Sequence, residues 1–324
     1  MATAELNANR VEAIVKSDSV PSLPAVAIQL VKMCGDEAVD VNELADTLSL
    51  DPALASKVLK LANSPKYCRR KAISNIKRAC MALGLKTLKI MSLSFSLTTA
   101  ARIKRSESQF NFDMYWFHSI CKAVVGRDLA RLTKEPFEDE AFFCGLVGRI
   151  GQLFMANGDS ESYNDVIASC SGDLPSAAEE RAILGFDLHL VGSRVLKKWE
   201  LPGDLVCAIE EWSKEESDSR LSRIVHLADI IATVICCESK GVACSVLYDK
   251  ATKLFGLTST EVDDFIVTLK EEVETLGGIL DVDVPKDLEY AEVIDEARRQ
   301  MIELTLETQL EVEDLRNRES TLRT

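Results

Sequence analysis

The sequence is poor in residues that interrupt helices. Only 8 prolines and 15 glycines occur among its 324 residues, so long stretches contain no helix breaker. No segment alternates apolar and polar residues between turn residues, the pattern typical of strands. Hydrophobic residues make up 47% of the chain and charged residues 28%, as in globular proteins. Together these features predict an all-α fold.

Several functional classes lack their sequence signatures. There is no uncharged apolar run of membrane-spanning length, and the first residues lack the basic and apolar pattern of a secretion signal. The 10 cysteines have no C-x-x-C or ligand-like spacing, which favours buried thiols over disulfides or a zinc site. No glycine-rich phosphate loop and no G-x-S-x-G motif is present. We therefore expect a cytoplasmic protein with no membrane span and no cofactor.

The net charge of −14 argues against a general affinity for nucleic acid or anionic membranes. Basic residues nevertheless concentrate between Lys66 and Arg105, where eleven Lys or Arg and no Asp or Glu occur. This basic run could bind phosphate, a nucleotide or an acidic partner, or it could be a solvated face balanced by acids elsewhere. Its candidate binding residues are Lys66, Arg69, Arg70, Lys71, Lys77 and Arg78.

One segment, Phe142–Met155, is apolar on nearly every side and is predicted to be a single buried helix. Gly145, Gly148 and Gly151 recur in it every three residues, a spacing that would let neighbouring helices approach closely. Since glycine costs a helix stability, three of them indicate a packing requirement. Arg149, in the middle of this segment, must pair with a carboxylate or reach solvent.

The end of the chain, from Tyr290 to Thr324, has no Gly or Pro and is predicted to be one long helix. Its imperfect heptad seam consists of Ile294, Met301, Leu315 and Leu322, with Thr308 in the missing position and Ala297 and Leu304 as a partner series. A lone helix with so thin an apolar stripe is not stable by itself. We therefore expect a homodimer through this helix, and the alternative is a solvated helix that folds back on the body.

Several blocks in the chain carry a family resemblance. They are LPAVAIQLVKM, VNELADTLSLDPALASKVLKLANSP, the Ala82–Gly84 turn, the Trp116–Ser119 segment, AFFCGLVGRIGQL, LHLVGSRVLKKWELPGDLVCAIEEW and IVHLADIIA. In this order, from about Pro21 to Ile231, the chain resembles the HDOD domain, a helical relative of the HD-type metal phosphohydrolases. The resemblance implies an N-terminal helical lobe at residues 1–107 and a degenerate HD-like lobe at residues 108–284, with a cleft between them. Residues 285–324 would form a C-terminal linker helix.

The departures from the HD enzymes concern their metal site. Those enzymes hold divalent cations with a His, an adjacent His-Asp pair and a later Asp, ligands that can generate a hydroxide nucleophile. By resemblance, His118 matches the first His and Asp229 the last Asp. The central His-Asp pair falls on Gly148 and Arg149, neither of which is a metal ligand. We expect no metal site, with His118 and Asp229 left as residual ligands.

Six residues of the HD-like lobe are candidates for a ligand site or cleft: His118, Arg149, His189, Trp212, His226 and Asp229. Trp212, with Glu211, stands where family members often carry paired histidines. Arg149 would hold Asp229 in the space of the ancestral metal, or it would reach the surface. The histidines would form a residual metal or phosphate site, or they would be inherited core residues.

The resemblance implies a regulatory, non-catalytic module of bacterial signalling. In this interpretation the module senses a ligand or binds a partner, and its C-terminal helix relays the event to an output domain or signalling protein. Cyclic-di-GMP synthesis is one candidate output, and we expect the natural chain to continue past Thr324. Two alternatives remain open: a metal-dependent phosphohydrolase with an unusual site, and a nucleotide-binding sensor that uses the basic run and the cleft.

Overall fold

The computed structural model describes residues 2–17, 20, 22–36, 38–68, 72–101, 109–170, 174–213, 217–238 and 240–322. These residues form eighteen helices and no strand, which confirms the predicted all-α fold. Within these ranges no single helix is both long and apolar enough to cross a membrane. Two consecutive helices, Ile76–Leu83 and Leu85–Ala101, reach that length and composition together, but they are bent by 115°.

The N-terminal lobe consists of α2 (Ala25–Gly35), α3 (Val41–Ser49), α4 (Pro52–Ala62), α5 (Ile76–Leu83) and α6 (Leu85–Ala101). Local sequence explains where these helices begin. The Asp51 side chain accepts a hydrogen bond from the backbone N–H of Leu54, and Pro52 takes the first helical position. Gly84 separates α5 from α6 with a φ of 85°, which L side chains rarely adopt. The buried α6 packs on both α2 and α8, so it joins this lobe to the next.

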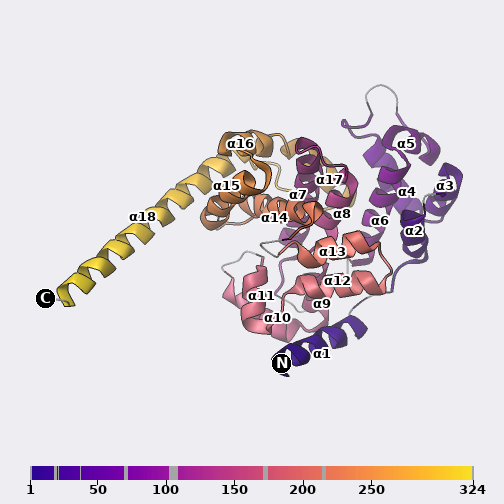
Figure 1. Cartoon of the computed structure of the whole chain (residues 1–324). Coiled ribbons are helices and arrows are strands. Elements are labelled where there is room, and N and C mark those ends of the chain that lie inside the picture. Colours follow the sequence, from indigo (N-terminus) through magenta and orange to yellow (C-terminus); the bar gives the residue numbers. More distant parts are fainter. Residues whose placement is uncertain are drawn as a thin grey trace.

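The HD-like lobe is arranged around α7 (Phe112–Leu132), which packs along α8 (Glu138–Val147) and α14 (Arg220–Cys236) (Figure 1). The helices α9 (Ile150–Gly158), α10 (Ser160–Ser169), α11 (Ala177–Leu184), α12 (Leu188–Lys198) and α13 (Gly203–Glu211) complete this lobe. Most residues of α7 are buried, including its charged residues Lys122 and Arg127. These two charges therefore need partners inside the protein.

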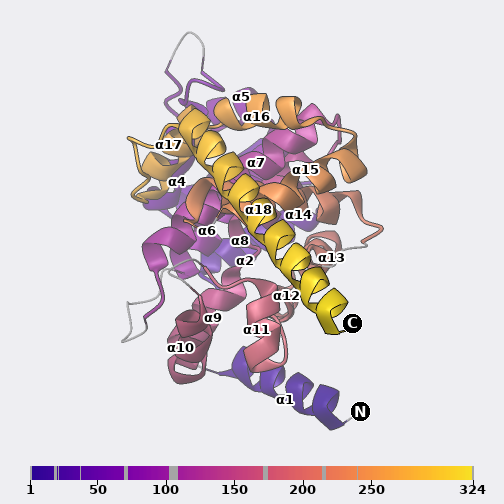
Figure 2. The same ribbon diagram turned by 90° about the vertical axis from the view of Figure 1, so that its left-hand side faces the viewer.

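The first helix, α1 (Ala2–Lys16), lies against the HD-like lobe, beside α9 and α12 (Figures 1 and 2). Its buried side carries Val11 and Val15. Arg10 Nη1 donates to the carbonyl of Leu184 at 3.0 Å, and Lys198 Nζ donates to the carbonyl of Val15 at 2.9 Å. This placement differs from the predicted division, which assigned all of residues 1–107 to the N-terminal lobe.

The prediction of one continuous helix over Phe142–Met155 is wrong, because the chain turns between α8 and α9. Arg149 has a φ of −100° and a ψ of 14°, outside the helical range. The close approaches expected at the glycines are present, but against two different helices. A Cβ on Gly145 would lie 2.6 Å from Cα of Ala123 on α7, and one on Gly151 would meet the backbone of α12. The two halves of the segment thus follow different neighbours, and the turn directs Arg149 into the lobe.

The chain ends in α15 (Gly241–Phe255), α16 (Ser259–Val267), α17 (Lys270–Leu280) and α18 (Tyr290–Leu322). The first turns of α18 pack on α14, α15 and α16, with Val293, Ile294 and Ala297 buried. Residues 302–310 are exposed, and α18 extends away from the body (Figure 1). The predicted long helix is therefore present. Its first part folds on the body, as in the alternative interpretation. The side chains of the seam residues Leu315 and Leu322 are not among those that the structure describes.

Candidate functional site

A buried ion pair between Arg149 and Asp229 lies at the centre of the HD-like lobe. Arg149 Nε donates to Asp229 Oδ1 at 2.9 Å, and Nη2 donates to Oδ2 at 2.8 Å. Nη1 of the same guanidinium donates to the carbonyl of Pro175 at 3.0 Å. Two parallel bonds between Arg and a carboxylate are a strong and geometrically specific contact. Of the two sequence interpretations of Arg149, the structure shows the pairing with Asp229 and not the route to the surface.

A second cation, Lys122 of α7, contacts the same carboxylate. Its Nζ lies 3.0 Å from Asp229 Oδ1 and 3.3 Å from the ring centroid of Trp212, close enough for a cation–π interaction. Lys122 is not among the site residues predicted from the sequence. The signal was its spacing, because Lys122 follows His118 by four residues and so lies on the same face of α7.

These two cations determine the protonation of the site. Burial alone would raise the pKa of Asp229, but Arg149 and Lys122 outweigh it and hold this pKa well below its ordinary value. Burial lowers the pKa of Lys122 to about 8, despite the carboxylate beside it. Asp229 is therefore ionised at neutral pH, and the cluster has an excess of positive charge.

The structure brings three further candidates to this ion pair. His118 Nε2 lies 4.0 Å from Asp229 Oδ1 and 3.2 Å from the hydroxyl of Thr233. Burial, and then the charge of Arg149, lower the pKa of His118 to about 3, so its ring is neutral. The ring of His189 meets Trp212 edge-on at a centroid distance of 4.1 Å. Trp212 thus contacts both a cation and an imidazole in this cluster.

The last candidate, His226, is the least buried of the six. It lies on α14 one turn before Asp229, as the spacing predicted. Burial lowers the pKa of His226 and lowers that of His189 well below its ordinary value. All three imidazoles are consequently shifted towards their neutral forms.

The residues of this cluster do not fit the metal that the HD resemblance implies. Gly148 provides no side chain, and Arg149 and Lys122 place their charges against the carboxylate that would bind the ion. Across the described part of the chain, no group of three or more His, Cys, Asp or Glu side chains is positioned to hold a metal. In this cluster the charge of Asp229 is neutralised by the side chains of Arg149 and Lys122, and this arrangement does not provide a set of metal ligands.

A buried polar network continues from the ion pair to α11 and α12. Gln152 Nε2 donates to Glu180 Oε1 at 2.7 Å and also to the Pro175 carbonyl that Arg149 contacts. The backbone N–H of Leu188 donates to the other Glu180 oxygen at 2.7 Å. Burial raises the pKa of Glu180 to about 7. Sequence analysis did not identify Glu180 or Gln152, because neither belongs to a motif.

A cavity of about 410 Å³ opens beside the ion pair, between α10, α11, α14 and α15. Asp229 and Thr233 lie on its polar wall, and Leu174, Val242 and Val246 form an apolar wall. This cavity is within the HD-like lobe and its C-terminal helices. A separate cavity lies between the two lobes, where α4 faces α7 and α17.

The described residues of the basic run lie in different places. Lys66 makes ion pairs with Asp128 and Glu272, while Lys77 and Arg78 are exposed on α5. The predicted candidates Arg69, Arg70 and Lys71 lie outside the described residues. Lys66 thus has the balancing acids that one interpretation of the basic run predicts, namely Asp128 and Glu272. It lies where helices meet, and not on an open face.

Replacing Arg149 by Leu should lower the free energy of unfolding by roughly 3 kcal/mol, because a buried carboxylate keeps only one cation. The control is Arg181→Leu, which removes a half-exposed pair with Asp187 at 2.6 Å. That loss should cost less than about 1 kcal/mol. Urea denaturation followed by circular dichroism measures both. Equal losses in the two variants would contradict a buried role for Arg149.

Replacing Glu180 by Gln should flatten the dependence of stability on pH. The pKa of Glu180 is 4.5 in its ordinary environment and about 7 in the folded protein, so its favourable contribution is complete below pH 4.5. That contribution is lost as the pH rises through 7, by up to about 3 kcal/mol. Unfolding at pH 5 and pH 8 should show a larger drop for the wild type than for Glu180→Gln. If stability changed with pH to the same extent in the wild type and in Glu180→Gln, the raised pKa of Glu180 would be contradicted.

The sequence and fold of this chain are similar to those of known proteins. The HDOD domain family matches residues 20–214 of the chain. An HDOD domain protein of unknown function from Geobacter sulfurreducens is similar with a TM-score of 0.67, at 19% identity, over 85% of this chain and 97% of that one. A Shewanella amazonensis protein, named as a candidate metal-dependent phosphohydrolase, is similar with a TM-score of 0.60, at 19% identity, over 86% of this chain and 100% of that one.

Two further relatives extend this comparison. A candidate signal transduction protein from Marinobacter aquaeolei is similar with a TM-score of 0.62, at 18% identity, over 85% of this chain and 65% of that one. At such identities the solved structures establish the fold alone. An uncharacterized protein of Treponema pallidum is 21% identical over 194 residues, which is 59% of this chain but only 37% of that protein. Since the HDOD match covers more than half of the 324 residues, the chain belongs to the HDOD domain family.

Proposed function

We propose that this chain is a non-catalytic regulatory module that acts in cytoplasmic signalling. The observation that supports the proposal is the bidentate contact of Arg149 with Asp229, the carboxylate that matches the last HD ligand. Lys122 holds the same carboxylate from the opposite helix, α7. A divalent ion would have to displace a buried, hydrogen-bonded pair, which is energetically costly. The HD scaffold thus keeps its shape, with side chains in place of the ion.

The module would sense a ligand or partner through its helical body and relay the event through α18. Asp229 lies on α14, and α14 packs directly on α18. Gln300 of α18 also accepts hydrogen bonds from the backbone N–H groups of Lys240 at 2.7 Å and Gly241 at 3.1 Å, where α15 begins. A displacement of α14 or α15 would therefore move α18. The relay would be a shift between two positions of α18, each favoured by a different state of the body.

The exposed part of α18 would pair with a second copy of the chain. Ile302, Leu306 and Leu310 are each more than half exposed and follow one another by four residues, so they lie on one side of the helix. A helix with an unpaired apolar stripe gains stability by burying it against a partner. A homodimer of this kind would present two parallel α18 helices to an output domain or signalling protein, with cyclic-di-GMP synthesis as a candidate output.

Metal analysis tests the non-catalytic proposal. After incubation with Mn²⁺, Fe²⁺, Zn²⁺ or Mg²⁺ and dialysis, the purified protein should retain far less than one ion per chain and should not hydrolyse a phosphodiester. The control is Arg149→Asp, which restores one of the missing carboxylates next to Asp229 and should increase retention. Close to one ion per wild-type chain, lost in Asp229→Asn, would instead favour a phosphohydrolase.

Sedimentation equilibrium tests the dimer. The double substitution Ile302→Glu and Leu306→Glu should convert dimers to monomers, because two charges would enter the apolar contact. Thr308→Glu adds a charge at an exposed position on the side of the helix opposite to Leu306 and should leave the dimer intact. A wild-type chain that is monomeric throughout the accessible concentration range would contradict pairing through α18.

A further inference from the structure

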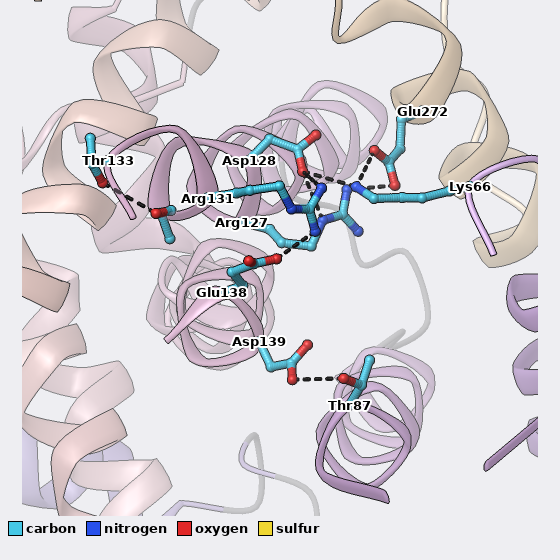
Figure 3. Close-up of polar contacts among 10 residues, drawn as sticks. Lys66, Thr87, Arg127, Asp128, Arg131, Thr133, Glu138, Asp139 and Glu272 are labelled. Atoms are coloured by element: carbon cyan, nitrogen blue, oxygen red, sulfur yellow. Dashed lines mark hydrogen bonds and ion pairs between the residues drawn. The ribbon is translucent and has the colours of Figure 1, made fainter. Parts of the chain in front are cut away.

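Three cations converge on one carboxylate oxygen at the junction of the N-terminal lobe with the rest of the body (Figure 3). Asp128 Oδ1 lies 2.9 Å from Lys66 Nζ, 3.2 Å from Arg127 Nε and 3.1 Å from Arg131 Nη1. Lys66 comes from the turn after α4, whereas both arginines and Asp128 belong to α7. We call Lys66, Arg127 and Arg131 the cationic cradle. Their charged donors lie close enough together to contact different oxygen atoms of one anion.

Two further carboxylates from other helices complete the neutralisation of the cradle. Glu272 of α17 lies 2.6 Å from Lys66 Nζ and 2.5 Å from Arg127 Nη2. Glu138 of α8 pairs with Arg131. The side chain of Arg127 is 2% exposed, whereas those of Lys66, Glu272 and Arg131 are 21%, 22% and 48% exposed. Arg127 is therefore the fixed cation of the cradle, and Glu272 is a partner that solvent reaches.

A cavity of about 400 Å³ opens onto this cradle between α4, α7 and α17. Lys66, Arg127 and Arg131 line one end of it, beside the carboxylates Asp128, Glu271 and Glu272. Two hydroxyl residues lie along it, Thr268 after α16 and Thr275 on α17. Its other end is apolar and contains Leu61, Leu276 and Ile279. Arg127 and Arg131 also line a neighbouring cavity of about 330 Å³. Cavities of this size accommodate small ligands.

We propose that this cavity binds a small phosphorylated molecule whose phosphate oxygens contact Lys66, Arg127 and Arg131 in place of Glu272. A phosphate group carries more charge than a carboxylate and offers three acceptor oxygens, and guanidinium groups bind it in a bidentate manner. The inference deepens the proposed function, on which it rests, by naming the class of ligand that the module senses. It also gives Lys66, a candidate of the basic run, a specific site.

The position of the cavity couples binding to α18. Glu272 lies on α17, and only residues 281–289 separate α17 from α18. A second ion pair, at 3.7 Å between Lys57 of α4 and Asp281 at the end of α17, also ties α17 to the N-terminal lobe. Lys270 at the start of α17 also pairs with Glu289, next to the start of α18. Release of Glu272 would loosen α17 from the N-terminal lobe and change the anchoring of α18.

Calorimetric titration of the full chain with inorganic pyrophosphate tests the proposal, with sodium chloride adjusted to constant ionic strength. Saturable binding is expected. Arg131→Met should weaken it at least about tenfold, because one charge-assisted contact is lost. Glu272→Gln should tighten it, because the competing charge is removed. The controls are Lys77→Met, an exposed cation outside the cavity, and Glu303→Gln, which makes the same charge change on α18; both should bind as the wild type does.

Hydrogen exchange of α17 and α18, measured with and without pyrophosphate, separates this site from the proposed relay. Faster exchange in α17 on binding supports both. Binding with unchanged exchange in these helices would keep the site and contradict the relay. A nucleoside diphosphate, titrated in parallel, tests what the apolar end of the cavity binds. If it binds more tightly than pyrophosphate does, the apolar end accommodates the base. Absence of saturable heat with pyrophosphate, or equal affinities in Arg131→Met, Glu272→Gln and their controls, would overturn the proposal.

Discussion

The bidentate contact between Arg149 and Asp229 is the constraint on which the HD-like lobe depends. It joins the turn between α8 and α9 to the middle of α14, and through Pro175 it also holds the chain before α11. The two side chains are only 6% and 10% exposed, so separating them would leave poorly solvated charges. The pair therefore holds the turn at Arg149, α14 and the chain before α11 together.

The same physical problem recurs at the second ionic centre. The chain is acidic overall, yet residues 66–105 contain no acid, so their charges must be balanced by distant parts of the sequence. Lys66 pairs with Asp128 and Glu272, and Lys86 of α6 pairs with Glu140 of α8 at 2.8 Å. Charge balance between segments thus holds the N-terminal lobe against the body. Because such contacts weaken when one partner is displaced, a ligand that replaces a carboxylate would act on the arrangement of the lobes.

Much of the helical framework could be predicted from local chemistry. The start of α4 follows from Asp51 and Pro52, and the break before α6 follows from Gly84, because both depend on the preferences of a few neighbouring residues. The turn at Arg149 could not be predicted this way. The segment is apolar on all sides, so its periodicity is that of one helix, and only the contacts of Gly145 with α7 and of Gly151 with α12 require it to bend.

The sequence by itself determined the all-α class, the HDOD resemblance and the presence of Gly148 and Arg149 in the middle of an apolar segment, since these depend on residue identity and local pattern. Only the tertiary structure decided that Lys122 joins Asp229, that α1 packs on the HD-like lobe, and that Lys66 meets Glu272. Those contacts join residues that are far apart in the chain. Their partners are selected by how helices pack and by which buried charges remain to be neutralised, and neither is a property of a local stretch of sequence.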